Sequence, residues 1–176
     1  MSLTKNAFDQ FRSYVGQPRS PAEELIANDD QRKLMSLEDG LMVWTDGVAS
    51  SKPRSNPPLI ERHQTQSVRL WVVREDDVVH AAEQCPFGAS LESGVIKHTN
   101  LTGAQEAYSG GELLFLDEST VVVNGRSGRY GPRSKLELDQ VVRAFAKSGY
   151  GVWSMGFDEE TNRPLGFVGT FPEWVE

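Results

Sequence analysis

The chain of 176 residues contains one cysteine and three histidines. A single cysteine, Cys85, excludes an intrachain disulfide and a zinc site built from several cysteines. The histidines, His63, His80 and His98, show neither the H-x-x-x-H nor the H-x-H spacing of a metal-binding motif. We therefore expect a protein with no metal site and no cofactor.

Long apolar runs and an excess of basic charge are also missing. No segment approaches the ~20 apolar residues of a membrane-spanning helix, and the opening stretch MSLTKNAFDQFRSYVGQ lacks the apolar core of a secretory signal. The net charge is -7, whereas a general nucleic-acid binder needs a basic surface. We expect a cytoplasmic protein, or an effector released without a cleaved signal. Its partner would be a small polar or anionic ligand or another protein, and neither a membrane nor nucleic acid in general.

The chain is long enough for one domain with a sizeable core, and 38% of its residues are hydrophobic. Residues 49–60, ASSKPRSNPPLI, are rich in proline and serine, which disfavour regular secondary structure. We expect a single domain in which this loop separates a helical part, residues 1–48, from a β-rich core, residues 61–176.

Helices are predicted by apolar periodicity and by capping residues. One apolar face runs through residues 3–15. A second helix is expected to begin at Ser20, because SPAEEL has the form of an N-terminal capping box, and a further short turn at Asp29. Ser134 opens another capping box before an apolar stripe, which predicts a helix over about residues 135–148.

Short apolar segments between turn residues predict the strands. They are DGLMVWTDGV, SVRLWVVRED, DVVHAAEQ, GVIKHTNL, ELLFL with VVVN, YGVWSMGF and LGFVGTF. This order of elements favours an α+β fold with a largely antiparallel sheet, on which the N-terminal helices and the helix at about 135–148 pack.

The hairpin of residues 109–125 has an apolar middle and polar ends. Pairing Asp117 with Thr120 across the turn places Glu112 opposite Gly125, at the border of an apolar stripe. A carboxylate there must be hydrogen-bonded or paired, or its pKa rises. The glycines around Glu112 would leave room beside the carboxylate for another group.

If GVIKHTNL is a strand that pairs with YSGGELL, His98 lies close to Glu112. This predicts a pocket in which His98 acts as acid or base, Glu112 orients it, and Tyr130 lies nearby. Predicted ligand-binding residues are Thr99, Asn124, Ser127 and Arg129. In the alternative interpretation, His98 and Glu112 simply hydrogen-bond within a structural network.

The stretch IKHTNLTGAQEAYSGGELLFLDESTVVVNGRSGRYGP resembles the pattern H-[ST]-x-[LF]-x-x-G, then [AG]-G-[ER], then S-G-[HR]-Y-x-P. This pattern is typical of uncharacterised bacterial proteins, some of them toxin- or effector-like. It also occurs in the C-terminal region of plant IQ-motif calmodulin-binding proteins. The resemblance covers about residues 94–157 and implies a shared domain without an agreed activity. The chain has Arg129 where histidine is frequent, and without an IQ segment a calmodulin partner is not implied.

HTNL also resembles the strand-borne histidine and hydroxyl of ADP-ribosyltransferases. In those enzymes the acidic residue follows the tyrosine, whereas here Glu112 precedes Tyr130. Two functions therefore stay open. One is a small enzyme that uses His98 and Glu112 on a polar or anionic substrate held by Arg129. The other is a non-catalytic interaction or immunity-type module with an acidic surface. The converging polar residues favour the first, and the negative charge favours the second.

Overall fold

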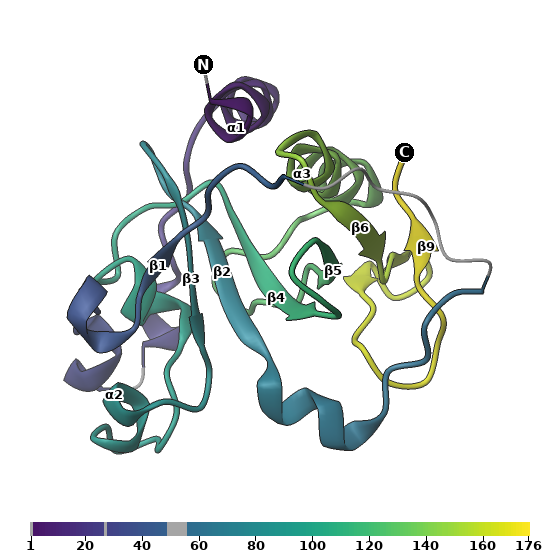
Figure 1. Cartoon of the computed structure of the whole chain (residues 1–176). Coiled ribbons are helices and arrows are strands. Elements are labelled where there is room, and N and C mark those ends of the chain that lie inside the picture. Colours follow the sequence, from purple (N-terminus) through teal and green to yellow (C-terminus); the bar gives the residue numbers. More distant parts are fainter. Residues whose placement is uncertain (1, 27, 49–55) are drawn as a thin grey trace.

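The computed structural model describes residues 2–26, 28–48 and 56–176, and it has an α+β fold built on one large sheet (Figure 1). The sheet has the strand order β1-β3-β2-β4-β5-β6-β9. Its strands are β1 (Met42–Val43), β2 (Arg69–Val73), β3 (Val78–Ala82), β4 (Ser109–Phe115), β5 (Thr120–Asn124), β6 (Gly151–Ser154) and β9 (Glu173–Trp174). Neighbouring strands are antiparallel except β5 and β6, so the predicted largely antiparallel sheet is confirmed.

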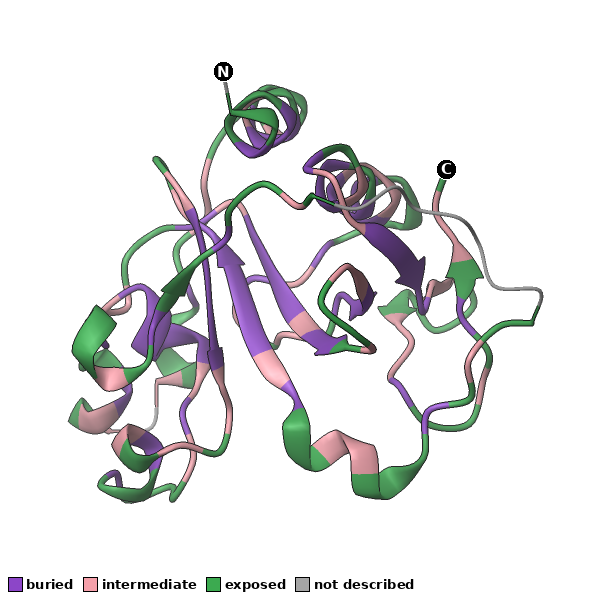
Figure 2. Cartoon of the chain, viewed as in Figure 1, coloured by how far each residue is buried: buried purple, intermediate pink, exposed green. Residues whose placement is uncertain are grey.

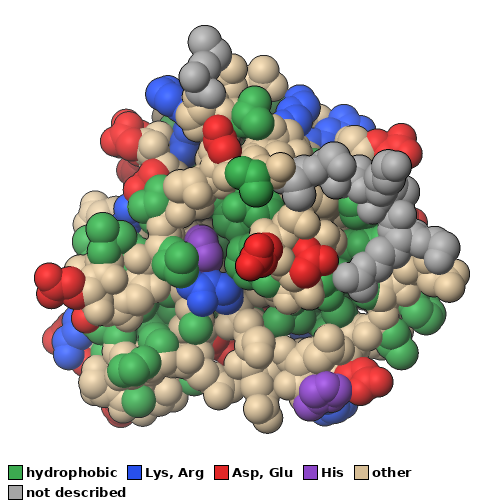
Figure 3. Space-filling model, viewed as in Figure 1, with side chains coloured by type: hydrophobic (Ala, Val, Ile, Leu, Met, Phe, Trp, Pro, Cys, Tyr) green, Lys and Arg blue, Asp and Glu red, His purple; other side chains and the backbone are tan. Residues whose placement is uncertain are grey.

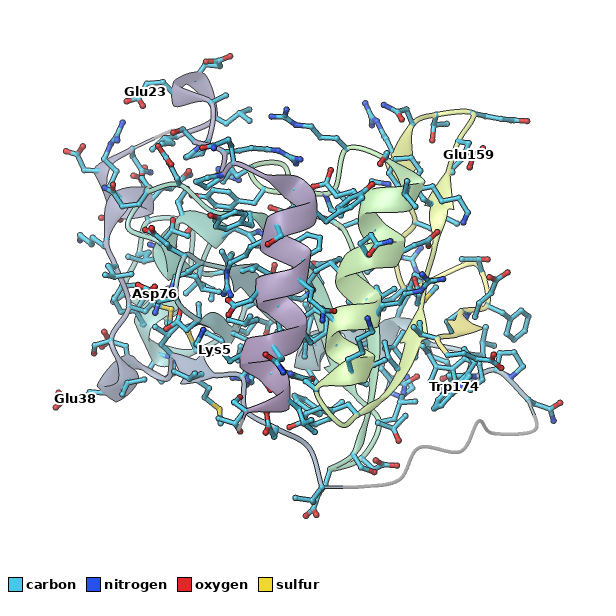
Figure 4. The ribbon with its side chains drawn as sticks, turned by 90° about the horizontal axis from the view of Figure 1, so that it is seen from above. Lys5, Glu23, Glu38, Asp76, Glu159 and Trp174 are labelled. Atoms are coloured by element: carbon cyan, nitrogen blue, oxygen red, sulfur yellow. The ribbon has the colours of Figure 1, made fainter. Side chains whose placement is uncertain are left out.

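Two long helices, α1 (Leu3–Val15) and α3 (Lys135–Lys147), lie side by side on one face of this sheet (Figures 1 and 4). Both follow the predicted ranges. The α3 helix begins where the sequence predicts, because the Ser134 hydroxyl accepts a hydrogen bond from the Glu137 amide. The rings of Phe8 and Phe145 meet edge to face with centroids 5.1 Å apart, which joins the two helices above the sheet.

The opposite face carries short elements. They are the α-helical turn α2 (Pro86–Ala89) and the 3-10 turns η1 (Glu23–Leu25), η2 (Asp29–Arg32), η3 (Leu37–Asp39), η4 (Arg62–Ser67) and η5 (His98–Leu101). A small hairpin of β7 (Phe157–Asp158) and β8 (Arg163–Pro164) follows β6, and its β7 strand contacts α3. Hydrophobic clusters fill the space on both sides of the sheet. The central strands are therefore buried along most of their length (Figure 2).

Three predicted elements are wrong. The segment from Ser20 forms only the short turn η1, whose N-cap is Ala22 and which has no buried residue to anchor a longer helix. LGFVGTF is not a strand, and β6 pairs with β9 instead. GVIKHTNL contains η5, because the Asn100 side chain accepts from the Lys97 amide and donates to the carbonyls of Asp30 and Lys33. These bonds compete with an extended strand.

The register of the β4–β5 hairpin differs by one residue from the prediction. Glu112 lies opposite Asn124, not opposite Gly125. The reason lies in the turn, where the Asp117 carboxylate accepts from the amide and the hydroxyl of Ser119, and the Leu116 amide donates to the Thr120 carbonyl. Because a one-residue slip changes the face of each side chain on one strand relative to the other, Glu112 and Asn124 become direct neighbours.

The N-terminal part is built into the same sheet, since β1 pairs with β3. The Trp44 indole donates to the Ser148 hydroxyl at the end of α3 over 2.9 Å. Residues 56–60 have no regular secondary structure, as predicted for the loop, and residues 49–55 lie outside the described part. Within the described ranges, no helix combines the length and the apolar character that a bilayer crossing requires.

Candidate functional site

Two adjoining cavities form a cleft on the sheet face opposite α1 and α3. The first cavity has a volume of about 510 Å³ and the second a volume of about 520 Å³. Three charged residues, Glu83, Glu112 and Arg126, line both cavities. Glu112 comes from β4, Arg126 follows β5, and Glu83 follows β3. The cleft is therefore assembled where the ends of two strands meet the middle of a third.

The Glu112 side chain is partly buried and held by Asn124. Its Oε1 accepts a hydrogen bond of 3.0 Å from the Asn124 amide group. The Oδ1 atom of the same Asn124 side chain accepts hydrogen bonds from the backbone N–H groups of Glu112 and Arg126, at 3.0 and 2.9 Å. Asn124 is fully buried, so all three bonds form away from solvent. The prediction that the Glu112 carboxylate is hydrogen-bonded is confirmed, although the side chain is only partly buried.

The environment of Glu112 favours its protonated form. Burial raises the pKa of this carboxyl, and the nearby negative charge of Glu83 raises it further. The hydrogen bond from Asn124 and the positive charge of Arg126 lower the pKa, but the net pKa stays above the ordinary glutamate value. Oε2 has no hydrogen-bond partner among the described residues. Glu112 thus presents a carboxyl oxygen to the cleft and keeps its proton to a higher pH than an ordinary glutamate.

His98 lines the first cavity, but it does not bond to the Glu112 carboxylate. Its Nε2 lies 2.8 Å from the carbonyl oxygen of Gly111, an obligate acceptor, so Nε2–H donates and the neutral ring has its lone pair on Nδ1. Burial, with the charges of Arg129 and Lys97, lowers the pKa of His98 to about 4. His98 is therefore uncharged at neutral pH and fixes the backbone just before Glu112.

Three of the predicted site residues face the interior. The Tyr130 hydroxyl donates to the Gln105 carbonyl over 2.7 Å and lies 2.8 Å from the Thr102 hydroxyl. Thr99 and Asn124 are fully buried. Of the described residues, those lining the first cavity include His98, Glu112, Ser127 and Arg129 but not these three. The structure thus divides the predicted set into cleft residues and residues that support them.

Cations surround the first cavity. Lys97, Arg126, Arg129 and Arg163 all line it. Within the described part of the chain, no carboxylate lies within 4.0 Å of any of the four. Arg129 is oriented by the Leu25 carbonyl and the Gln31 side chain, each 2.7 Å from Nη2, and its buried Nε has no partner among the described residues. Such unpaired cations favour an anionic ligand.

The glycines beside Glu112 do not leave room for a ligand. A Cβ at Gly111 would lie 2.1 Å from the Asn124 carbonyl oxygen and 2.7 Å from the Trp71 ring. At Gly110 it would meet the Tyr130 Cβ at 3.0 Å, and at Gly125 the Pro132 ring at 2.9 Å. The missing side chains instead allow close packing beneath the cleft, so the predicted role of these glycines is wrong.

Sequence reasoning missed Glu83, Lys97 and Arg163. Glu83 reaches the cleft because β2 lies between β3 and β4, which a single sequence does not reveal. Among the described residues, no group of three or more His, Cys, Asp or Glu side chains is placed to hold a metal ion.

Comparison with protein-family models, with curated proteins and with solved structures finds no match to this chain. The resemblance of residues 94–157 to bacterial effector-like and plant IQ-motif proteins therefore stays a prediction.

Proposed function

We propose that the protein is an enzyme that binds a small anionic substrate in this cleft and uses Glu112 as its acid–base group. The observation that carries the proposal is a partly buried carboxyl with a raised pKa, facing a cavity with four unpaired cations. A general acid is most effective when its pKa lies near the working pH, and burial beside a second carboxylate moves a glutamate in that direction.

The substrate would carry a phosphate or carboxylate group. Arg126 lines both cavities, and Lys97, Arg129 and Arg163 add positive charge around the first. A guanidinium binds either anion through two parallel hydrogen bonds. With the anionic group held there, water attacks the phosphorus or carbonyl carbon of the ester. The protonated Glu112 donates its proton to the leaving oxygen as the bond to that oxygen breaks, and it regains a proton from the attacking water.

Glu83 and His98 would support this step without touching the reacting atoms. The Glu83 charge raises the pKa of Glu112 and so keeps its proton available. His98 acts as a positioning residue, because its bond to the Gly111 carbonyl fixes the strand next to Glu112. Ser127 orders the basic loop, since its hydroxyl accepts from the amides of Arg129 and Tyr130.

The test is turnover, by the wild type and by Glu112→Gln, of a panel of small phosphate monoesters and of carboxylic esters that carry a separate free carboxylate. Glutamine keeps the shape and can still accept from Asn124, but it cannot transfer a proton. We expect the rate to fall by about 10²-fold or more, the usual contribution of a general acid. The matched control is Glu118→Gln, which changes an exposed carboxylate in the β4–β5 turn and should leave the rate unchanged.

Arg126→Met should weaken substrate binding, seen as a raised KM. The wild-type rate should also decline as pH rises through the raised pKa of Glu112, because the acid loses its proton. If Glu112→Gln turns over every ester as fast as the wild type, the proposal is wrong. A wild type that neither turns over nor binds any member of the panel would contradict it too, and would favour the protein-interaction module.

A further inference from the structure

A separate cavity of about 330 Å³ lies on the other face of the sheet, at the end where β2 begins and β4 finishes. The side chains that shape it are Trp44, Arg69, His80, Phe115 and Tyr150. Figure 3 shows this side of the molecule, with a histidine and a basic side chain lying together among hydrophobic side chains near its centre. None of these residues lines the cleft of Glu112.

Arg69 is a partly buried cation without a counter-ion. Its Nε donates to Nδ1 of His80 over 2.7 Å. Among the described residues its Nη atoms have no hydrogen-bond partner, and no carboxylate lies within 4.0 Å. Burial lowers the pKa of Arg69. A guanidinium that has lost part of its hydration and meets no protein anion is stabilised by an anion from outside.

His80 holds this guanidinium in place and contributes no charge. Because its Nδ1 accepts from Arg69, the proton of the neutral ring is on Nε2. Burial, with the positive charge of Arg69, lowers the pKa of His80 to about 3. The ring is therefore neutral at physiological pH, and the net charge of the cavity is that of Arg69.

The walls are aromatic. The Trp44 ring lies 4.4 Å from Tyr150, 5.5 Å from His80 and 5.8 Å from Phe115, measured between centroids, and it is stacked on Phe115 with an interplanar angle of 22°. Phe115 is 40% exposed, so it offers ring surface to a ligand. An aromatic cage commonly binds an ammonium group, but here Arg69 would repel it.

We propose that this cavity binds a small aromatic anion. A planar ring would pack against the exposed Phe115 ring, which the buried Trp44 supports from behind, and a carboxylate or phosphate on that ring would accept hydrogen bonds from the Nη atoms of Arg69. The cavity volume of about 330 Å³ lies at the lower end of the range for small-molecule sites, about 300–1,000 Å³. This volume suits a ligand with a single ring or with two fused rings. The site is independent of the proposed catalytic cleft, because it lies on the other face of the sheet and shares no residue with it.

The test is a titration of the ¹⁵N-labelled protein with phenyl phosphate, followed by amide chemical shifts. We expect saturable shifts at residues 42–45, 69, 80, 115 and 150. Phenylacetate in place of phenyl phosphate shows which anionic group is preferred. Benzyl alcohol, benzylamine and inorganic phosphate test the ring and the charge separately, and each should bind at least tenfold more weakly than the better of the two aromatic anions.

Arg69→Met keeps the aliphatic stem and removes the charge, so it should weaken binding of the aromatic anion at least tenfold. Arg143→Met, an exposed change on α3, is the matched control and should have no effect. If Arg69→Met does not fold, Phe115→Leu decides, since loss of the ring surface must also weaken binding. The proposal is overturned if benzyl alcohol binds as tightly as the aromatic anion, or if these variants bind the anion as the wild type does. It is also overturned if the chemical shifts change only at residues 111–112 and 125–131, in the Glu112 cleft.

Discussion

The contact between Glu112 and Asn124 allows a sharp test of how the cleft is held together. Asn124→Asp keeps Oδ1, which accepts the two backbone N–H groups, and replaces the amide nitrogen that donates to Glu112. The new carboxylate oxygen would lie about 3.0 Å from Oε1 of Glu112. A favourable hydrogen bond thus becomes a like-charge pair, with little change in shape.

The magnitude follows from this distance. Two unit charges 3.0 Å apart repel by about 5.5 kcal/mol at an effective dielectric constant of about 20. The pair can lower that cost by sharing one proton, which raises the folded-state pKa of the pair above the values of the unfolded chain. A raised folded pKa gives stability that is present at acidic pH and is lost as pH rises through it. We expect a loss of about 2–5 kcal/mol at pH 7.5 and most of it recovered near pH 4.5.

Urea unfolding followed by tryptophan fluorescence at both pH values measures this. Asn56→Asp adds the same charge at an exposed position and is the control. The double variant Asn124→Asp/Glu112→Gln exchanges the two partners, so the glutamine amide can donate to the new carboxylate and should restore most of the stability at pH 7.5. Equal destabilisation of Asn124→Asp at both pH values, or no rescue in the double variant, would refute the reasoning.

Three further predictions concern neighbouring groups. Because the pKa of Glu112 is raised in the folded protein, the wild type loses stability as pH rises through that pKa. Glutamine does not titrate, so the free energy of unfolding of Glu112→Gln, measured by urea unfolding, should increase relative to that of the wild type between pH 4 and pH 8. Tyr130→Phe should lower the free energy of unfolding by about 1–3 kcal/mol, because the Gln105 carbonyl loses its hydrogen-bond donor. Its affinity for an anionic ligand of the Glu112 cleft should stay within twofold of the wild-type value in a titration. Gly111→Ala should cost about 3 kcal/mol or more in thermal unfolding because its Cβ would overlap a backbone oxygen, whereas Gly128→Ala, which meets no atom within 4 Å, should cost under about 1 kcal/mol.

Much of the fold could be predicted because the signals are local. Apolar periodicity and the Ser134 cap specify α1 and α3, and the alternation of apolar segments specifies β2 to β5. The prediction fails where distant residues decide the backbone. The strand expected around His98 is replaced by η5, because Asn100 bonds to carbonyls some 70 positions away in sequence. The one-residue error in the hairpin arises from the side-chain bonds of Asp117, which turn propensities alone do not specify.

Part of the candidate site could be predicted from the sequence. A carboxylate beside an apolar stripe marks Glu112 as unusual, and the glycine-spaced loop marks Ser127 and Arg129. The sequence does not distinguish a hydroxyl that faces a ligand from one that satisfies a buried carbonyl, and the Tyr130 hydroxyl has the second arrangement. Glu83 carries no local signal, since its approach to Glu112 depends only on the order of the strands.

The two outermost strands of the sheet, β1 and β9, are only two residues long and come from segments far apart in the sequence. Such short strands offer an approaching chain very few free N–H and C=O groups. Each also covers a longer neighbour, β3 with five residues and β6 with four. Cutting the chain before β9 would leave the outer edge of β6 without its partner strand, and detaching β1 would do the same to β3. The two short edge strands therefore protect the sheet from edge-to-edge aggregation. Forms of the protein that lack one of them should self-associate under conditions in which the 176-residue chain stays monodisperse.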